Sequence, residues 1–102
     1  MKAIIDGKRY DTDTAELVAG YSVGASGDFE REEEALYKTH KGAWFTAGEG
    51  GPRSSYATHY RNESRGGAAI RPLTEALAQQ WLEDFNKVEE LERFFGTKVE
   101  DA

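Results

Sequence analysis

The amino-acid sequence predicts an α+β fold, with a small antiparallel sheet of three to five strands, a short N-terminal helix and two C-terminal helices packed on one face. Two observations support this prediction. Short apolar and aromatic runs separated by glycine-rich turns fill the first two thirds of the chain, whereas residues 74–95 show the apolar spacing of helices. A chain of 102 residues with 12% aromatic residues is expected to form a single domain, residues 1–102.

Two hairpins are predicted in the first half of the chain. The first turns on Asp6-Gly7, a dipeptide typical of tight hairpin turns. The second joins the aromatic-rich runs 35–39 and 43–47, and Gly42 falls where a left-handed conformation is needed to close the turn.

The register of the second hairpin follows from its three-residue turn. Tyr37 is expected opposite Phe45 on one side of the ladder. Lys38 is expected opposite Trp44 on the other side, where its ammonium group can lie over the indole ring.

A short helix is predicted between these hairpins. Asp13 precedes Glu16 by three residues, which is the spacing of a capping box, and Gly20 suits a helix end. We therefore expect a helix over residues 13–20, followed by a loop over residues 22–28. The side chains expected to be buried by this helix are those of Leu17, Val18 and Tyr21.

Two further strands are expected before the C-terminal helices. Residues 55–60 alternate tyrosine and threonine with other residues, which is typical of a strand with one aromatic face. Residues 68–71 form the second of these strands, and Pro72 is expected to end it because proline cannot donate to a ladder.

Two helices are predicted at the C-terminus. Thr74 is expected to cap a helix that continues through Phe85, and Asn86 with Glu89 forms a second capping box for a helix that Gly96 ends. The apolar side chains expected in the core are those of Leu77, Trp81, Phe85, Leu91 and Phe95.

The composition favours a cytoplasmic location. The chain has no cysteine, so it has no disulfide framework and no thiolate chemistry. The apolar run near the N-terminus is only three residues long, and no run approaches the roughly 20 apolar residues of a membrane span. We expect a cytoplasmic protein with no membrane partner.

Charge is segregated along the chain. Residues 1–37 carry a net charge of −5, residues 38–71 carry +4 and residues 72–102 carry −5. Such sorting is typical of a polar recognition surface, because it supplies a field that steers an oppositely charged partner. The candidate partner-binding residues are the acidic run and the hairpin aromatics, namely Glu30, Glu32, Glu33, Glu34, Tyr37 and Trp44.

Two other interpretations of the acidic run stay open. A solvated, charged strand edge would protect the sheet from aggregation without binding anything. A divalent-cation site is less favoured, because calcium loops space their ligands alternately and bend around the ion at a glycine, whereas this run is contiguous. We expect no metal and no cofactor.

The basic middle segment suggests an alternative function. Cations and aromatic residues alternate over residues 53–71, which is the pattern of a platform for single-stranded nucleic acid. The flanking acidic blocks oppose this, because they repel phosphates, and internal pairing of these arginines is the other interpretation. The candidate nucleic-acid-binding residues are Arg53, Tyr56, Tyr60, Arg61 and Arg65.

No catalytic signature is present. The glycine-rich run 48–51 lacks the lysine and helix of a phosphate loop, and a strand-to-strand turn explains it better. His40 and His59 have no second ligand at helical spacing. We expect no enzyme activity and no small-molecule substrate; a small hydrolase centred on His59 is a third hypothesis that the sequence does not support.

The run 9–15, the hairpin 36–45 with the glycines after it, and Trp81-Leu82-Glu83 resemble a group of small uncharacterised proteins carried by bacteria, phages and other mobile elements. The resemblance implies a shared α+β fold and no catalytic residue. In size and charge alone the chain is also similar to anti-CRISPR and other anti-defence inhibitors. This similarity implies a non-enzymatic phage or mobile-element inhibitor in the cytoplasm of a bacterial host, where it blocks a nucleic-acid-handling defence complex by protein–protein contact.

Overall fold

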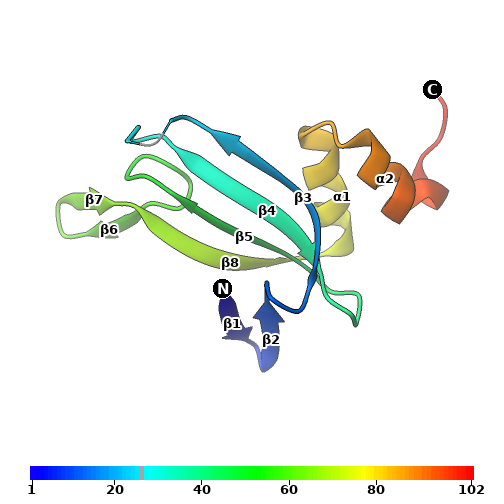
Figure 1. Cartoon of the computed structure of the whole chain (residues 1–102), viewed down its shortest axis with the longest axis horizontal. Helices are drawn as coiled ribbons and strands as arrows, with labels where there is room; N and C mark the ends of the chain where they lie inside the picture. Colours follow the sequence, from blue (N-terminus) through cyan, green and yellow to red (C-terminus); the bar gives the residue numbers. More distant parts are fainter. Residues whose placement is uncertain (26) are drawn as a thin grey trace.

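The computed structural model describes residues 1–25 and 27–102, and these residues have an α+β fold with antiparallel sheets and two α-helices near the C-terminus (Figure 1). The elements, in chain order, are β1 (Lys2–Ile5), β2 (Lys8–Asp11), β3 (Glu16–Val23), β4 (Glu32–Lys38), β5 (Trp44–Gly50), β6 (Thr58–Tyr60), β7 (Glu63–Arg65), β8 (Gly67–Leu73), α1 (Glu75–Asp84), α2 (Val88–Phe95) and a 3-10 turn, η1 (Gly96–Lys98).

The central sheet has the strand order β3-β4-β5-β8. The expected hairpin of β4 and β5 is confirmed in its register, which pairs Tyr37 with Phe45 and Lys38 with Trp44. Gly42 has a φ of +91°, so a left-handed residue does close the turn. The Nζ atom of Lys38 lies 5.2 Å from the centroid of the Trp44 ring, as the register predicts.

The predicted helix over residues 13–20 is wrong, because this segment forms β3. The Asp13 amide, which the Glu16 side chain would hold in a capping box, donates to Oδ1 of Asp11 at 2.9 Å instead. The carbonyl of Asp11 also accepts from the amide of Ala15 at 3.1 Å. The following residues then pair with β4 along its whole length, with a bulge between Leu17 and Ala19.

The burial of the three side chains expected under that helix also differs from the prediction. The side chain of Leu17 is exposed, whereas Val18 and Tyr21 are half-buried. Of the expected loop 22–28, Ser22 and Val23 belong to β3, and Ser26 lies outside the described residues.

Pro72 does not end the last strand. It lies inside β8, opposite Phe45. Because β8 is an edge strand, the missing N–H of proline need not interrupt a ladder.

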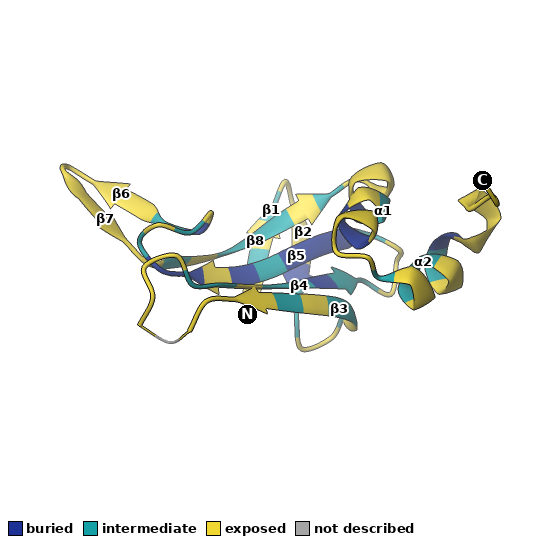
Figure 2. Cartoon of the chain, turned by 90° about the horizontal axis from the view of Figure 1, so that it is seen from above, coloured by how far each residue is buried: buried dark blue, intermediate teal, exposed yellow. Residues whose placement is uncertain are grey.

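The strand expected over residues 55–60 is shorter than predicted. Only its last three residues form β6, which pairs with β7 in a separate hairpin. Figure 2 shows that β6 and β7 are exposed along their whole length, whereas buried residues follow β5 and reach α1.

The main core lies between the central sheet and the helices. Its buried members are Leu36, Trp44, Ala78, Trp81, Leu82 and Phe95. Leu77 was expected in the core but is 54% exposed, and Phe85 is only partly covered, by the stacked ring of Tyr21 at a centroid distance of 4.1 Å.

The turn between the helices differs from the predicted capping box. Asn86 has a φ of +54° and ends α1, because its amide and that of Lys87 bind the carbonyl oxygens of Glu83 and Leu82. Asn86 therefore belongs to the C-terminal turn of α1 and does not cap α2. The helix α2 begins after Lys87 without a side-chain cap.

The N-terminal hairpin of β1 and β2 contacts the central sheet through the side chain of Tyr10. Asp6 and Gly7 have φ values of +52° and +76°, as the expected tight turn requires. Tyr10 is buried and meets the ring of Phe45 edge-on, with the ring centroids 5.5 Å apart. No described helix is long and apolar enough to cross a membrane.

Candidate interaction surface

The acidic run 30–34 is divided between the two faces of the central sheet. Successive side chains of a strand point to opposite faces, so Glu32 and Glu34 share the face of Leu36, which we call the inner face. Glu33 lies on the opposite face, which we call the open face. Glu30 precedes β4 and is exposed.

The two carboxylates on the inner face are acceptors for donors of the protein itself. Glu34 accepts hydrogen bonds from the hydroxyl of Tyr56 and, at 2.5 Å, from Nε1 of Trp81. Glu32 accepts from the hydroxyl of Tyr21 and from the amide and hydroxyl of Ser55, at 2.7 and 2.5 Å. Both are therefore engaged in holding the segment 51–57 and α1 to the sheet.

These contacts shift three pKa values. Burial alone would raise the pKa of Glu32, but the hydrogen bonds from Ser55 and Tyr21 and the charge of Arg71 hold it below its ordinary value. Burial, followed by the hydrogen bond to a glutamate, raises the pKa of Tyr21 and of Tyr56 well above the ordinary value. Both tyrosines therefore stay protonated and keep donating.

Arg71 completes the inner face. Its guanidinium lies 3.9 Å from the centroid of the Tyr56 ring, and it donates to the carbonyl oxygen of Ser55 at 2.6 Å. The Tyr56 ring packs directly on Gly48, where an added Cβ would lie 2.4 Å from the ring. Glycine is thus needed at this position for the tyrosine to reach Glu34.

The open face carries a shallow groove of about 660 Å³. Cross-strand pairing places Gly20, Ala35 and Ala47 side by side in its floor. The next row pairs Glu33 with Glu49, and both side chains are exposed. The groove therefore combines a floor of small residues with two adjacent carboxylates, next to which Tyr37 forms part of the lining.

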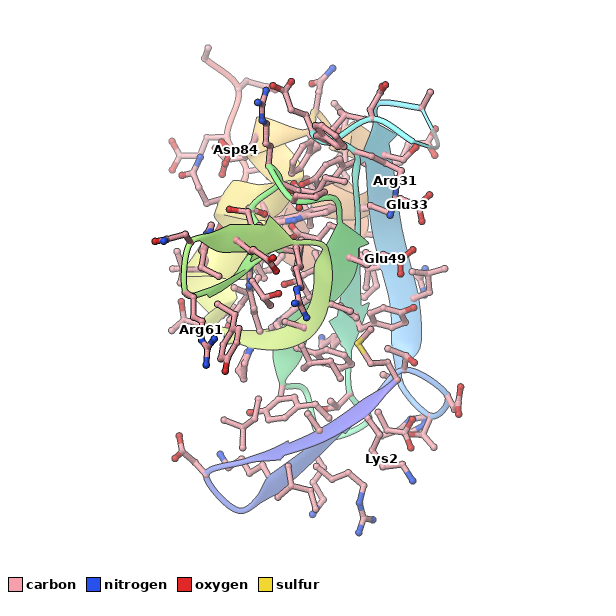
Figure 3. The ribbon with its side chains drawn as sticks, turned by 90° about the vertical axis from the view of Figure 1, so that its left-hand side faces the viewer. Lys2, Arg31, Glu33, Glu49, Arg61 and Asp84 are labelled. Atoms are coloured by element: carbon pink, nitrogen blue, oxygen red, sulfur yellow. The ribbon has the colours of Figure 1, made fainter. Side chains whose placement is uncertain are left out.

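Among the described residues, the two carboxylates of the groove take part in one ion pair. Arg31 lies 3.7 Å from Oε1 of Glu49, in an ion pair whose glutamate is 55% exposed. Figure 3 shows Arg31, Glu33 and Glu49 close together, where β4 begins and β5 ends. An exposed pair of this kind contributes little to stability, so Glu49 can exchange this partner for another cation.

The hairpin aromatics proposed for partner binding lie on opposite faces. Tyr37 is half-buried on the open face and stacks on Phe45, with the ring centroids 5.2 Å apart. Trp44 is buried in the core against Phe95 and is covered by Lys38. Tyr37 is thus accessible from the groove, whereas Trp44 is not.

The side chains of the basic segment, residues 53–71, are also divided between buried and exposed positions. Tyr56 is buried, and Arg53 lies 5.8 Å from the ring of Phe29. Tyr60, Arg61 and Arg65 are exposed together on the hairpin of β6 and β7, where Arg61 covers the Tyr60 ring at 5.2 Å. The structure therefore brings three of the five candidate nucleic-acid-binding residues together.

His59 is on the same hairpin. Its Nδ1 atom is 2.9 Å from Oγ of Ser64, and both residues are exposed. Among the described residues, no carboxylate is bonded to this imidazole, and no group of three or more His, Asp or Glu side chains is placed to hold a metal ion.

The groove contains residues that the sequence analysis did not select. Glu49 follows directly from the hairpin register, because the pairing that places Tyr37 opposite Phe45 also places Glu33 opposite Glu49. The floor is different: Gly20 enters it only because residues 16–23 form a strand. No local pattern indicates that contribution.

Comparison with known proteins adds no family to this geometry. No protein-family model, no curated protein and no solved structure matches the chain. A functional proposal must therefore rest on the residues and contacts of the chain itself.

Proposed function

We propose that this protein is a non-catalytic inhibitor of a nucleic-acid-handling protein complex, of the type that phages and mobile elements direct against bacterial defence. Its open face receives a basic segment of that complex. The observation that carries the proposal is the groove with a floor of small residues and the adjacent carboxylates of Glu33 and Glu49.

The chemistry of the groove favours a basic peptide segment as its occupant. The missing side chain of Gly20 and the small side chains of Ala35 and Ala47 allow a backbone to approach the sheet closely. Glu33 and Glu49 offer acceptors for an arginine or lysine, and proteins that bind nucleic acid carry such cations on their working surfaces. The net charge of −6 adds a long-range attraction that speeds encounter with such a surface.

The proposal is tested by reversing the two groove charges. The double variant Glu33→Lys/Glu49→Lys is compared with the wild-type protein for binding to a panel of purified bacterial nuclease effector complexes. The expected result is that a complex bound by the wild-type protein loses affinity by about tenfold or more, because like charges face each other at the contact. The wild-type affinity is also expected to fall as salt is raised.

A matched control separates this site from a general effect of charge. Glu89→Lys/Glu92→Lys makes the same change in net charge at exposed positions of α2. This control is expected to bind nearly as well as the wild-type protein. Equal losses in both double variants, or no loss in the groove variant, would contradict the proposal.

The exposed hairpin of β6 and β7 favours single-stranded nucleic-acid binding as a second candidate. Tyr60 is 60% exposed and offers a ring for base stacking, and Arg61 offers a cation beside it. Arg65 is exposed on the same hairpin, where it forms an ion pair with Glu63 at 2.9 Å. A gel shift with labelled oligonucleotides at low salt distinguishes the candidates. A shift that Tyr60→Ala abolishes supports this candidate, and no shift removes it.

A further inference from the structure

A second cleft lies between the N-terminal hairpin and the turn that joins β4 to β5. Its volume is about 570 Å³, within the range of small-molecule sites. Residues of β2, of the segment after β2, and of the β4–β5 turn line it together. The polar and aromatic members of this lining include Lys8, Arg9, Tyr10, Thr14, His40 and Lys41.

The cleft gathers positive charge in an acidic protein. Lys8, Arg9 and Lys41 contribute three cations, although the whole chain carries a net charge of −6. None of the three forms an ion pair with another described residue. The acidic member of the lining, Asp11, already accepts the amide hydrogen of Asp13 at 2.9 Å. Cations held in a concave surface focus the field on whatever enters it.

The walls of the cleft are fixed by contacts outside it. Tyr10 anchors β2 to the central sheet through its edge-on contact with Phe45. On the other wall, the Thr39 hydroxyl accepts from the amide of Ala43 at 3.0 Å, and the Thr39 carbonyl accepts from Gly42 at 2.9 Å. The backbone therefore does not have to be ordered when a ligand binds, which lowers the cost of binding.

We propose that this cleft binds a phosphorylated ligand through its phosphate groups. Lys8, Arg9 and Lys41 all line this one cleft, and several cations match the multiple charge of a phosphate or a pyrophosphate better than the single charge of a carboxylate. The guanidinium of Arg9 can donate two parallel hydrogen bonds to phosphate oxygens, and each lysine adds a point charge. The hydroxyl of Thr14 is a further polar group in the lining.

Two sources supply the same chemistry, a free nucleotide and the backbone of a nucleic acid. The test therefore uses three probes at low salt: sodium pyrophosphate, ATP and an oligothymidylate. Each is titrated into the full-length protein, with calorimetry for affinity and amide chemical shifts for location. Saturable binding that shifts the amides of residues 8–11 and 39–43 is the expected result.

Charge-removing variants locate the contact. Arg9→Gln and Lys41→Gln change exposed side chains on the two walls, and each is expected to weaken binding of the probes about tenfold. Lys2→Gln is the matched control, because Lys2 is exposed on β1 of the same hairpin but does not line the cleft. It is expected to weaken binding no more than about twofold, because its side chain contributes no group to the lining of the cleft.

The measured affinities test whether the cleft binds phosphate groups, and they distinguish a free nucleotide from a nucleic-acid backbone. Tighter binding of ATP and pyrophosphate supports a free nucleotide, and tighter binding of the oligothymidylate supports a nucleic-acid backbone, provided that Arg9→Gln weakens it. Absence of saturable binding for all three probes overturns the proposal. Equal weakening by Lys2→Gln and Arg9→Gln also overturns it, because the attraction would then belong to the hairpin as a whole.

Discussion

At the scale of single residues, neighbouring glutamates of β4 have different roles. Glu32 and Glu34 point into the inner face and accept hydrogen bonds from residues of α1, β3 and the segment 51–57. Glu33, between them, points into the groove of the open face. The structural carboxylates and the candidate recognition carboxylate therefore come from a single contiguous run.

The Glu32→Gln variant tests the structural role by its dependence on pH. The pKa of Glu32 is lower in the folded protein than its ordinary value of 4.5. Its charged form therefore stabilises the fold above that pH, and this contribution is lost as the pH falls through the lowered pKa. At pH 7 we expect Glu32→Gln to lower the free energy of unfolding by about 1–3 kcal/mol. Urea unfolding at pH 7 and near pH 3 measures it, and the difference between variant and wild type should shrink at the lower pH.

Glu33→Gln is the control for this measurement. It makes the same chemical change one residue along the strand, where the side chain is exposed. We expect it to change the free energy of unfolding little at either pH. If Glu32→Gln destabilises the protein equally at both pH values, the charge of Glu32 is not what its partners recognise.

The donors to these two carboxylates explain why sequence alone could not assign them. Ser55 and Tyr56 lie 23 and 22 residues from the glutamates that they bind, and Trp81 lies 47 residues from Glu34. Alternation along a strand predicts that two of the glutamates share a face. It does not predict which face is covered, because the cover comes from distant parts of the chain.

At the scale of elements, turns specified by local chemistry were predictable. Asp6-Gly7 and Gly42 close the expected hairpins, and Thr74 caps α1 through its hydroxyl, which accepts from the Leu77 amide at 3.1 Å. The segment 13–20 was predicted wrongly. Its residue spacing favours a helix start, but hydrogen bonds to β4 hold residues 16–20 in a strand. Long-range pairing decided that element, and the floor of the groove depends on it.

The N-terminal hairpin is predicted to depend on one aromatic contact. Tyr10→Ala removes the buried ring that meets Phe45, a change that costs about 3–5 kcal/mol for large aromatic side chains in a core. We expect the hairpin to detach, so that the amides of β1 and β2 exchange rapidly with solvent. The amides of β4 and β5 should remain protected, because their ladder does not involve the hairpin. Hydrogen exchange measured by NMR separates the two sheets.

The exposed Tyr60 provides the matched control. Tyr60→Ala removes the same side chain from the hairpin of β6 and β7 and should leave the exchange of β1 and β2 unchanged. Uniform loss of protection in Tyr10→Ala would show that the hairpin and the central sheet unfold as one unit. Phosphate binding in the second cleft should disappear with Tyr10→Ala, because β2 forms one of its walls.

At the scale of the whole molecule, the fold arranges charge more finely than the sequence does. The acidic N-terminal block supplies both the carboxylate Glu33 of the groove and the cations Lys8 and Arg9 of the second cleft. The basic middle block supplies Glu49 to the groove and Lys41 to the cleft. The proposed recognition sites are therefore local clusters from different blocks, and the block charges alone do not identify them.

The central claim is that the open face, and no other acidic surface of the chain, receives a basic segment. Titration of the labelled protein with an arginine-rich peptide, followed by amide chemical shifts, tests it most directly, because α2 and the C-terminal residues offer a competing acidic surface in the same molecule. We predict that the largest shifts fall on Gly20, Ala35 and Ala47, and that Glu33→Lys/Glu49→Lys removes them. Shifts that are as large on α2, or that persist in the double variant, would contradict the account.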